Sequence, residues 1–276
     1  MTADGFEAES GGVVLRGVRD GTGRPVVLAH GLTAHRDLVV HGSRALARAG
    51  HDVIRYDARG HGDSDAGEAG SYVYEQLADD LDAVVAATGA ERPVLVGHSM
   101  GAHTIATLAL RDPERWAGLV LIGPASVGVP LEPESLANWD RLADGLADGG
   151  IEGFIAAYEV GMDPEWHDTL VRIARERLGR HRDLDAVAEA VREVPRSLPF
   201  DGIAELAGLD VPALVVASND EADPGHPHAV AAAWVDALPA ARMIGEGEGE
   251  GDRVSPLAWQ GGKLSREIAA FCAGLG

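Results

Sequence analysis

Apolar residues in this chain fall into two alternating patterns, short continuous runs and longer segments with helical spacing. Continuous runs are typical of strands buried on both faces of a parallel sheet. They predict strands over residues 26–29, 51–56, 94–96, 118–122, 211–217 and 241–244. Helical spacing between the runs predicts helices over residues 35–50, 72–87, 104–110, 227–237 and 257–271. A strand, helix, strand succession at this spacing indicates parallel βαβ units, and therefore an α/β protein with a mostly parallel central sheet.

The first residues of the chain follow a different pattern. Residues 12–18 alternate weakly between apolar and polar, and they run into Asp20, Gly21, Thr22 and Gly23. Weak alternation that ends in a glycine-rich turn suggests an N-terminal hairpin.

A long segment without a strong strand signal separates the fourth and fifth of these runs. It carries helical patterns instead, over residues 136–146, 151–160, 165–178 and 183–194. A helical insertion between two core strands is most simply a cap over one edge of the sheet. We therefore expect a core of residues 1–124 and 201–276, with residues 125–200 as a helical cap.

Composition narrows the class of protein. Of the 276 residues 46% are hydrophobic, which is ample for a core, and the net charge is −21. That charge repels nucleic acid and anionic membranes, so we expect neither as a partner, and it disfavours highly anionic substrates. No apolar run is long enough to span a bilayer, and residues 1–10 lack the features of a signal peptide. We expect a cytoplasmic protein whose partner is a small-molecule substrate or ligand.

Neither a metal nor an organic cofactor is expected. Cys272 is the only cysteine, which excludes an internal disulfide and a cysteine metal cluster. The glycine-rich segment 57–64 follows a predicted strand but lacks the Gly-Lys-Ser/Thr of a phosphate-binding loop.

The most informative stretch is residues 94–103, where an apolar run leads into Gly97, His98, Ser99, Met100 and Gly101. Gly-x-Ser-x-Gly between a strand and a helix is the pattern of a nucleophile elbow, a strained turn that exposes the serine at its apex. The glycines let strand and helix approach closely. Ser99 is therefore the candidate nucleophile.

A serine nucleophile needs donors for the oxyanion that develops during attack. The backbone N–H of Met100, which follows the serine, is one candidate donor. The second is expected from the loop after the 26–29 strand, and we assign the N–H of Leu32. His30 in that loop is interpreted as a loop-ordering residue rather than the general base.

With these motifs in order, the chain resembles the α/β-hydrolase fold, in particular the group of small capped esterases, lactonases, C–C hydrolases and perhydrolases. The resemblance covers nearly the whole chain from residue 12, and the cap matches least specifically. It rests on His30-Gly31, on Asp57-x-Arg59-Gly60-x-Gly62-x-Ser64, on the elbow, and on Leu238-Pro239-x-Ala241. The resemblance implies a serine hydrolase whose catalytic acid follows the strand after the cap.

Three carboxylates lie in the loop where such an acid is expected. The family's acid-Pro-x-His-Pro run matches Asp223, whereas the usual distance from the strand end favours a position nearer Glu221. Asp223 is preferred, and Asp220 and Glu221 remain alternatives. Each of the three is equally compatible with capping the helix that begins near Pro227.

The general base is where the chain departs from the family. The resemblance places a histidine just before the last helix, at about Val254 or Ser255, but no histidine follows His228. His226 on the acid loop is the leading substitute. The alternatives are His98 and His103 beside the serine, and Asp252 acting through water. A further possibility is that no conventional base exists.

Two functions remain open on the sequence. The first is hydrolysis of a small ester, lactone or related carbonyl compound by Ser99. The second is a catalytically degenerate protein of the same fold that binds a small molecule or has a regulatory role. Five side chains of the predicted cap either line a substrate or ligand pocket or pack the cap helices against one another. They are Trp139, Phe154, Tyr158, Met162 and Trp166.

Overall fold

The computed structural model describes residues 3–41, 44–158, 167–218, 225–245 and 262–275. Within these ranges the chain forms one eight-stranded sheet in the order β1-β2-β4-β3-β5-β6-β7-β8. The strands are β1 (Asp4–Ser10), β2 (Val13–Gly21), β3 (Arg24–Ala29), β4 (His51–Tyr56), β5 (Val94–His98), β6 (Gly118–Ile122), β7 (Ala213–Ala217) and β8 (Ala241–Gly245). From β4 to β8 neighbouring strands are parallel, whereas β1, β2 and β4 pair antiparallel.

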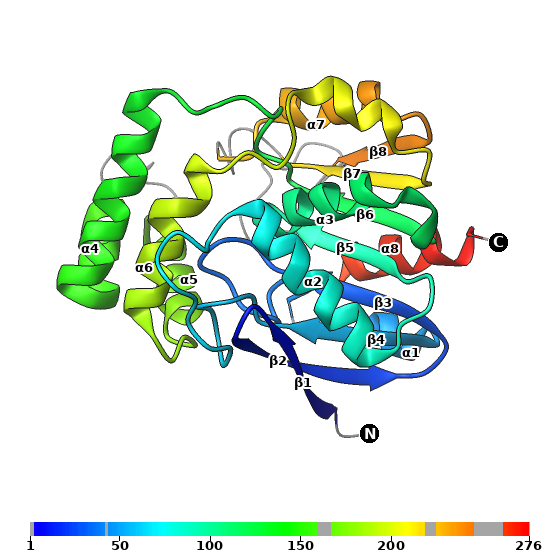
Figure 1. Ribbon diagram of the computed structural model, residues 1–276, viewed down its shortest axis with the longest axis horizontal. Coiled ribbons are helices and arrows are strands. Elements are labelled where there is room, and N and C mark those ends of the chain that lie inside the picture. The colour runs from blue at the N-terminus through cyan, green and yellow to red at the C-terminus, as the bar shows by residue number, and fades with distance from the viewer. Residues whose placement is uncertain (1–2, 42–43, 159–166, 219–224, 246–261, 276) are drawn as a thin grey trace.

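Helices cover both faces of this sheet (Figure 1). They are α1 (Ala45–Arg48), α2 (Tyr74–Thr88), α3 (Met100–Arg111), α7 (His228–Ala237) and α8 (Lys263–Ala273). Alternate side chains of each central strand enter two separate cores. Val27, Leu95 and Leu119 pack with α2, α3 and α7, whereas Val26, Val94 and Val120 pack with α1 and α8. The predicted α/β fold and parallel strands are confirmed.

Between β6 and β7 the chain forms α4 (Pro133–Tyr158), α5 (His167–Leu178) and α6 (Leu184–Glu193). Figure 1 shows these helices grouped to one side of the sheet. Their buried side chains form a small apolar core. α4 is kinked at Gly150, whose φ of 59° is non-helical and lies between the two helices predicted over residues 136–146 and 151–160. The helical character predicted for this part of the chain is confirmed where it is described.

One predicted helix is wrong, and the predicted hairpin turns at a different place. The helix over residues 35–50 is reduced to α1, because His41 has a φ of 47° and residues 35–40 form turns tied to the neighbouring loop through Arg36. The N-terminal hairpin exists, but it turns at Gly11 and Gly12. The glycines at 21–23 instead lead β2 into β3, which does not pair with it.

No described helix combines the length and apolarity needed to cross a bilayer. The described residues also contain no group of three or more histidine, cysteine or carboxylate side chains arranged to hold a metal ion. Cys272 is buried and unpaired, and burial raises the pKa of its thiol to about 11.

Candidate active site

Ser99 occupies the sharp turn between β5 and α3. Its backbone has φ 52° and ψ −113°, outside the regions that non-glycine residues favour. A conformation of this kind costs about 1–3 kcal/mol and persists only where the surroundings enforce it. Here the Ser99 N–H donates to the Ile122 carbonyl of β6 at 2.9 Å, and the Ser99 carbonyl accepts the first bond of α3, from His103 N–H at 3.1 Å. The half-buried side chain therefore lies at the carboxyl edge of the sheet.

Close packing of three backbone segments explains the glycines around Ser99. A Cβ atom on Gly101 would collide with the carbonyl of Ala29, and one on Gly97 would collide with the backbone of Gly101. A Cβ on Gly31 would lie 2.9 Å from His98 Nδ1 and 3.4 Å from Ser99 Cβ. The loop after β3 therefore lies directly against the serine, as the Gly-x-Ser-x-Gly pattern requires.

The peptide joining Gly31 to Leu32 has a fixed orientation. Its carbonyl accepts hydrogen bonds from the Ala34 N–H at 3.0 Å and from His30 Nδ1 at 2.8 Å. Because N–H and C=O of a trans peptide point in opposite directions, these two bonds also aim the Leu32 N–H. Among the described residues neither this N–H nor that of Met100, at the start of α3, has a protein acceptor. Both donors are thus unused within the described part of the chain.

His30 orders two loops. Its Nδ1 is bound to the Gly31 carbonyl, and its Nε2 accepts the N–H of Ala58 at 2.9 Å. The ring is buried, and burial lowers the pKa of His30 to about 3, so it remains neutral with both nitrogens engaged. This agrees with the interpretation of His30 as a loop-ordering residue.

The structure brings His226 to the elbow. Its imidazole lies against that of His98, with ring centroids 5.2 Å apart and an interplanar angle of 48°. A Cβ on Gly123, just after β6, would lie 3.3 Å from His226 Cγ. Although His226 is far along the chain from the serine, it contacts the residue immediately before Ser99. Both imidazoles have further interactions, so neither is a free side chain.

His103, one of the alternative bases, is occupied elsewhere. Its Nε2 accepts the N–H groups of Ala125 at 3.1 Å and Ser126 at 3.2 Å, and its Nδ1 is bonded to the Tyr74 hydroxyl at 2.9 Å. Burial lowers the pKa of His103 to about 3. Its ring therefore holds the segment after β6 in place and has no lone pair left for the Ser99 proton.

The candidate acids lie outside the described residues. Asp220, Glu221 and Asp223 fall in the range 219–224, and Asp252, Val254 and Ser255 fall in the range 246–261. Asp223 as the acid therefore stays a prediction. So does the role of Asp252 as a base.

The glycine-rich segment 57–64 is a structural turn with two buried ion pairs. Asp57 accepts from the Arg36 backbone N–H at 2.7 Å and from its guanidinium. Arg59 binds Asp80 through two hydrogen bonds of 2.7 Å, and both side chains are almost completely buried. The charged residues of this motif hold the loops beside the serine and form no phosphate cradle.

The sequence analysis did not single out two histidines that contact the loop of residues 30–34. His61 accepts the Thr33 N–H through Nε2 at 3.3 Å, and His181 donates from Nε2 to the Thr33 carbonyl at 2.9 Å. His181 lies between α5 and α6, so it is distant in sequence from the loop that it contacts. No spacing rule links such positions. Only the positive φ of Thr33, 63°, marks this turn as unusual, and it is a property of the folded chain.

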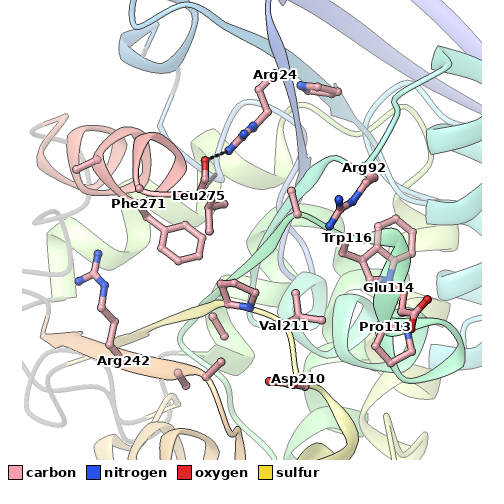
Figure 2. Close-up of a pocket in the computed structure, with 18 of the residues that line it drawn as sticks. Arg24, Arg92, Pro113, Glu114, Trp116, Asp210, Val211, Arg242, Phe271 and Leu275 are labelled. Atoms are coloured by element: carbon pink, nitrogen blue, oxygen red, sulfur yellow. Dashed lines mark hydrogen bonds between the residues drawn. The ribbon is translucent and has the colours of Figure 1, made fainter.

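A separate cavity of about 1180 Å³ opens at the opposite, amino-terminal edge of the sheet (Figure 2). Its walls include Trp116, Arg92, Arg242 and Phe271, and Arg24 there donates to the Leu275 carbonyl at 2.8 Å. None of the candidate catalytic residues lines it. It is not the space in which Ser99 would meet a substrate.

Comparison with known proteins agrees with this geometry. The family model described as "alpha/beta hydrolase fold" matches residues 24–205. The chain belongs to this family. The match includes the loop after β3, the elbow and the three inserted helices.

Two relatives of this α/β-hydrolase-fold protein are named as hydrolases. This chain is 32% identical over 203 residues to the putative carbamate hydrolase RutD of Variovorax paradoxus. The aligned region covers 72% of this chain and 75% of that protein. The chain is 29% identical to a 2-hydroxy-6-oxononadienedioate/2-hydroxy-6-oxononatrienedioate hydrolase of Burkholderia vietnamiensis, over 64% of this chain and 62% of the relative. The chain thus spans less than two thirds of that second relative.

A solved structure extends the likeness to the whole fold. The enol-lactonase of Burkholderia xenovorans superposes with a TM-score of 0.78 at 23% identity, over 97% of this chain and 100% of that one. At this identity the superposition supports the fold alone.

Proposed function

We propose that this protein hydrolyses small esters, lactones or related carbonyl compounds through Ser99. One observation carries the proposal. The strained Ser99 turn lies against a loop whose Leu32 N–H is aimed and lacks a protein acceptor among the described residues. A backbone that is held in an unfavourable conformation beside unused donors is characteristic of a catalytic turn rather than of a structural one.

Attack begins when the Ser99 hydroxyl adds to the substrate carbonyl carbon. His226 takes the hydroxyl proton as general base, since its ring lies against His98 at the start of the elbow. The carbonyl oxygen becomes an oxyanion and accepts hydrogen bonds from the N–H groups of Leu32 and Met100. One such donor typically contributes about 100- to 1000-fold in rate.

The tetrahedral intermediate then expels the leaving group, to which protonated His226 returns its proton. An acyl-Ser99 intermediate remains, and a water deprotonated by His226 hydrolyses it to the acid product and free serine. In this scheme Asp223 orients His226, three positions away on the same loop. It stabilises the imidazolium that forms at each step.

Residues 125–200 serve as the cap in this proposal. Leu32 packs against both the main core and the core of α4, α5 and α6, so these helices reach the loop that holds the oxyanion. Trp139 and Tyr158 are partly buried against the same small core. A site beside such apolar side chains favours small, apolar acyl groups. The net charge of −21 disfavours highly anionic substrates.

The second candidate is a degenerate hydrolase that only binds a carbonyl ligand. It is favoured by one observation, the absence of any histidine after His228 in the sequence. In that case Ser99 and the two N–H groups hydrogen-bond the ligand without turnover.

Labelling with a fluorophosphonate probe separates the two functions. We expect covalent labelling at Ser99 and hydrolysis of p-nitrophenyl butyrate between pH 6 and 9, and we expect both to be lost in Ser99→Ala while the fold is retained. A wild-type protein that binds ester analogues but is neither labelled nor active at any pH in this range would establish the second candidate.

A further inference from the structure

The turn that presents the Leu32 N–H is built with an unusual residue. Residues 31–34 form a β-turn closed by the bond from Ala34 N–H to the Gly31 carbonyl. Thr33, its third residue, has a φ of 63°. Turns with a positive φ at this position normally carry glycine or asparagine there, because a β-branched side chain disfavours it. Other contacts must therefore hold Thr33.

Two histidines hold the two polar groups of the Thr33 backbone. The N–H donates to His61 Nε2 at 3.3 Å, and the carbonyl accepts from His181 Nε2 at 2.9 Å. The remaining nitrogens are also engaged: His61 Nδ1 donates to the Arg59 carbonyl at 2.9 Å, and His181 Nδ1 accepts the Gly62 N–H at 2.8 Å. Each ring thus has one donor and one acceptor in use, which fixes its tautomer.

His181 reaches this turn from the inserted helices. Its neighbour Arg182 donates from the backbone N–H to the Gly62 carbonyl at 3.1 Å and from its guanidinium to the Asp63 carbonyl at 3.0 Å. The His181 ring packs edge-on against His61, with centroids 5.4 Å apart. This is a specific attachment between the α5–α6 connection and the core loops, made almost entirely to backbone groups.

We propose that His181 is a positioning residue that holds the Leu32 N–H in place through Thr33, and so couples the inserted helices to the oxyanion site. The inference rests on the proposed function of Ser99. Without His181, the Thr33 carbonyl loses its donor and the turn relaxes away from the positive φ. The Leu32 N–H, one residue earlier, then no longer points toward the oxyanion position.

The test compares His181→Ala with two matched variants. His181→Gln keeps one donor and one acceptor, and Arg180→Ala changes an exposed neighbour on the same segment. With p-nitrophenyl butyrate we expect His181→Ala to lower kcat by about 10- to 100-fold, because the oxyanion contact forms only in the transition state. We expect KM and the pH profile to keep their wild-type form, His181→Gln to recover part of kcat, and Arg180→Ala to match wild type.

Hydrogen exchange at residues 30–35 gives a readout that does not depend on turnover. We expect exchange in His181→Ala to be at least about tenfold faster there, with Arg180→Ala unchanged. If His181→Ala folds poorly, the double variant Thr33→Gly with His181→Ala replaces it, since glycine accepts the positive φ. Its loss of kcat should be smaller than that of His181→Ala.

Unchanged kcat in His181→Ala would overturn the proposal, as would unchanged exchange at residues 30–35. A wild-type protein without turnover or labelling would refute the proposed function instead. In that event the exchange data still decide whether His181 holds this turn.

Discussion

The imidazole of His226 lies against that of His98, with ring centroids 5.2 Å apart, at the residue that precedes Ser99. A loop that follows β7 thereby brings an imidazole to the turn that follows β5. Both strands end at the same edge of the parallel sheet, which is why residues so distant in sequence meet. In the function we propose, His226 substitutes for the histidine expected near Val254 or Ser255.

Replacing His226 tests this substitution directly. We expect His226→Ala to lower kcat/KM for p-nitrophenyl butyrate by about 100- to 10,000-fold, as removal of a general base does. His98→Ala is the matched variant and should lose far less, because it only supports the His226 ring. The reverse order of effects would make His98 the base.

Strain at Ser99 predicts a difference in stability between two inactive variants. Glycine adopts a φ of 52° without penalty, whereas alanine keeps the Cβ that makes this conformation unfavourable. We expect Ser99→Gly to be more stable than Ser99→Ala by about 1 kcal/mol, which corresponds to about 2–4 °C in Tm for a chain of this size. Differential scanning calorimetry measures it. Equal Tm values would show that the strain relieved at Ser99 does not exceed the additional backbone entropy that glycine loses on folding.

Buried neutral histidines predict acid lability. Burial lowers the pKa of His30, His61 and His103 to about 3, well below the usual 6.5 of the unfolded chain. Between these values the unfolded state binds more protons, so stability is complete above about pH 6.5 and declines as the pH falls towards 3. Each such histidine contributes about 1.4 kcal/mol per pH unit in that window.

Urea unfolding at pH 7, 6, 5 and 4 measures this slope. His103→Gln removes one titrating group, and its slope should be shallower than that of wild type by one proton. Identical slopes for the two proteins would show that His103 titrates alike in the folded and unfolded states.

The Arg59–Asp80 pair predicts a large cost when one partner is removed. Asp80→Ala leaves a buried guanidinium without a counter-charge, so we expect it to lower the free energy of unfolding by about 3–5 kcal/mol. Asp79→Ala, which breaks the exposed pair with Arg111, should cost less than about 1 kcal/mol. Replacing both buried partners, as in Arg59→Met with Asp80→Leu, should restore much of the loss. Urea denaturation of the three variants decides the matter.

The sequence predicted the central sheet well because parallel strands buried on both faces have continuous apolar sequences, as in β6 and β7. The elbow was equally predictable, because Gly-x-Ser-x-Gly between a strand and a helix is a local motif, although the Gly101 backbone also packs against the distant Ala29 carbonyl. The prediction of a helix over residues 35–50 was wrong, because contacts with distant segments determine the conformation there. His41 adopts a positive φ, and Arg36 is drawn to Asp57 and Asp63, contacts that periodicity does not encode.

The residues of the candidate site also differ in how far the sequence could predict them. Ser99, Leu32 and Met100 belong to local motifs, and their placement follows from the strand ends on which they lie. The contacts of His226 with His98 and of His181 with Thr33 join distant loops, so only the folded chain reveals them. His103 illustrates the converse. It is adjacent to the serine in sequence, yet its ring serves the backbone of Ala125 and Ser126.

Leu32 packs into the main core and into the core of the inserted helices at once, and the Thr33 carbonyl is bonded to a histidine of that insertion. The insertion is therefore not an interchangeable module. A chimera that received residues 133–196 from another family member would lose the partner of the Thr33 carbonyl and the packing around Leu32. Transplanting specificity into this scaffold requires redesigning the 30–34 loop together with the helices above it.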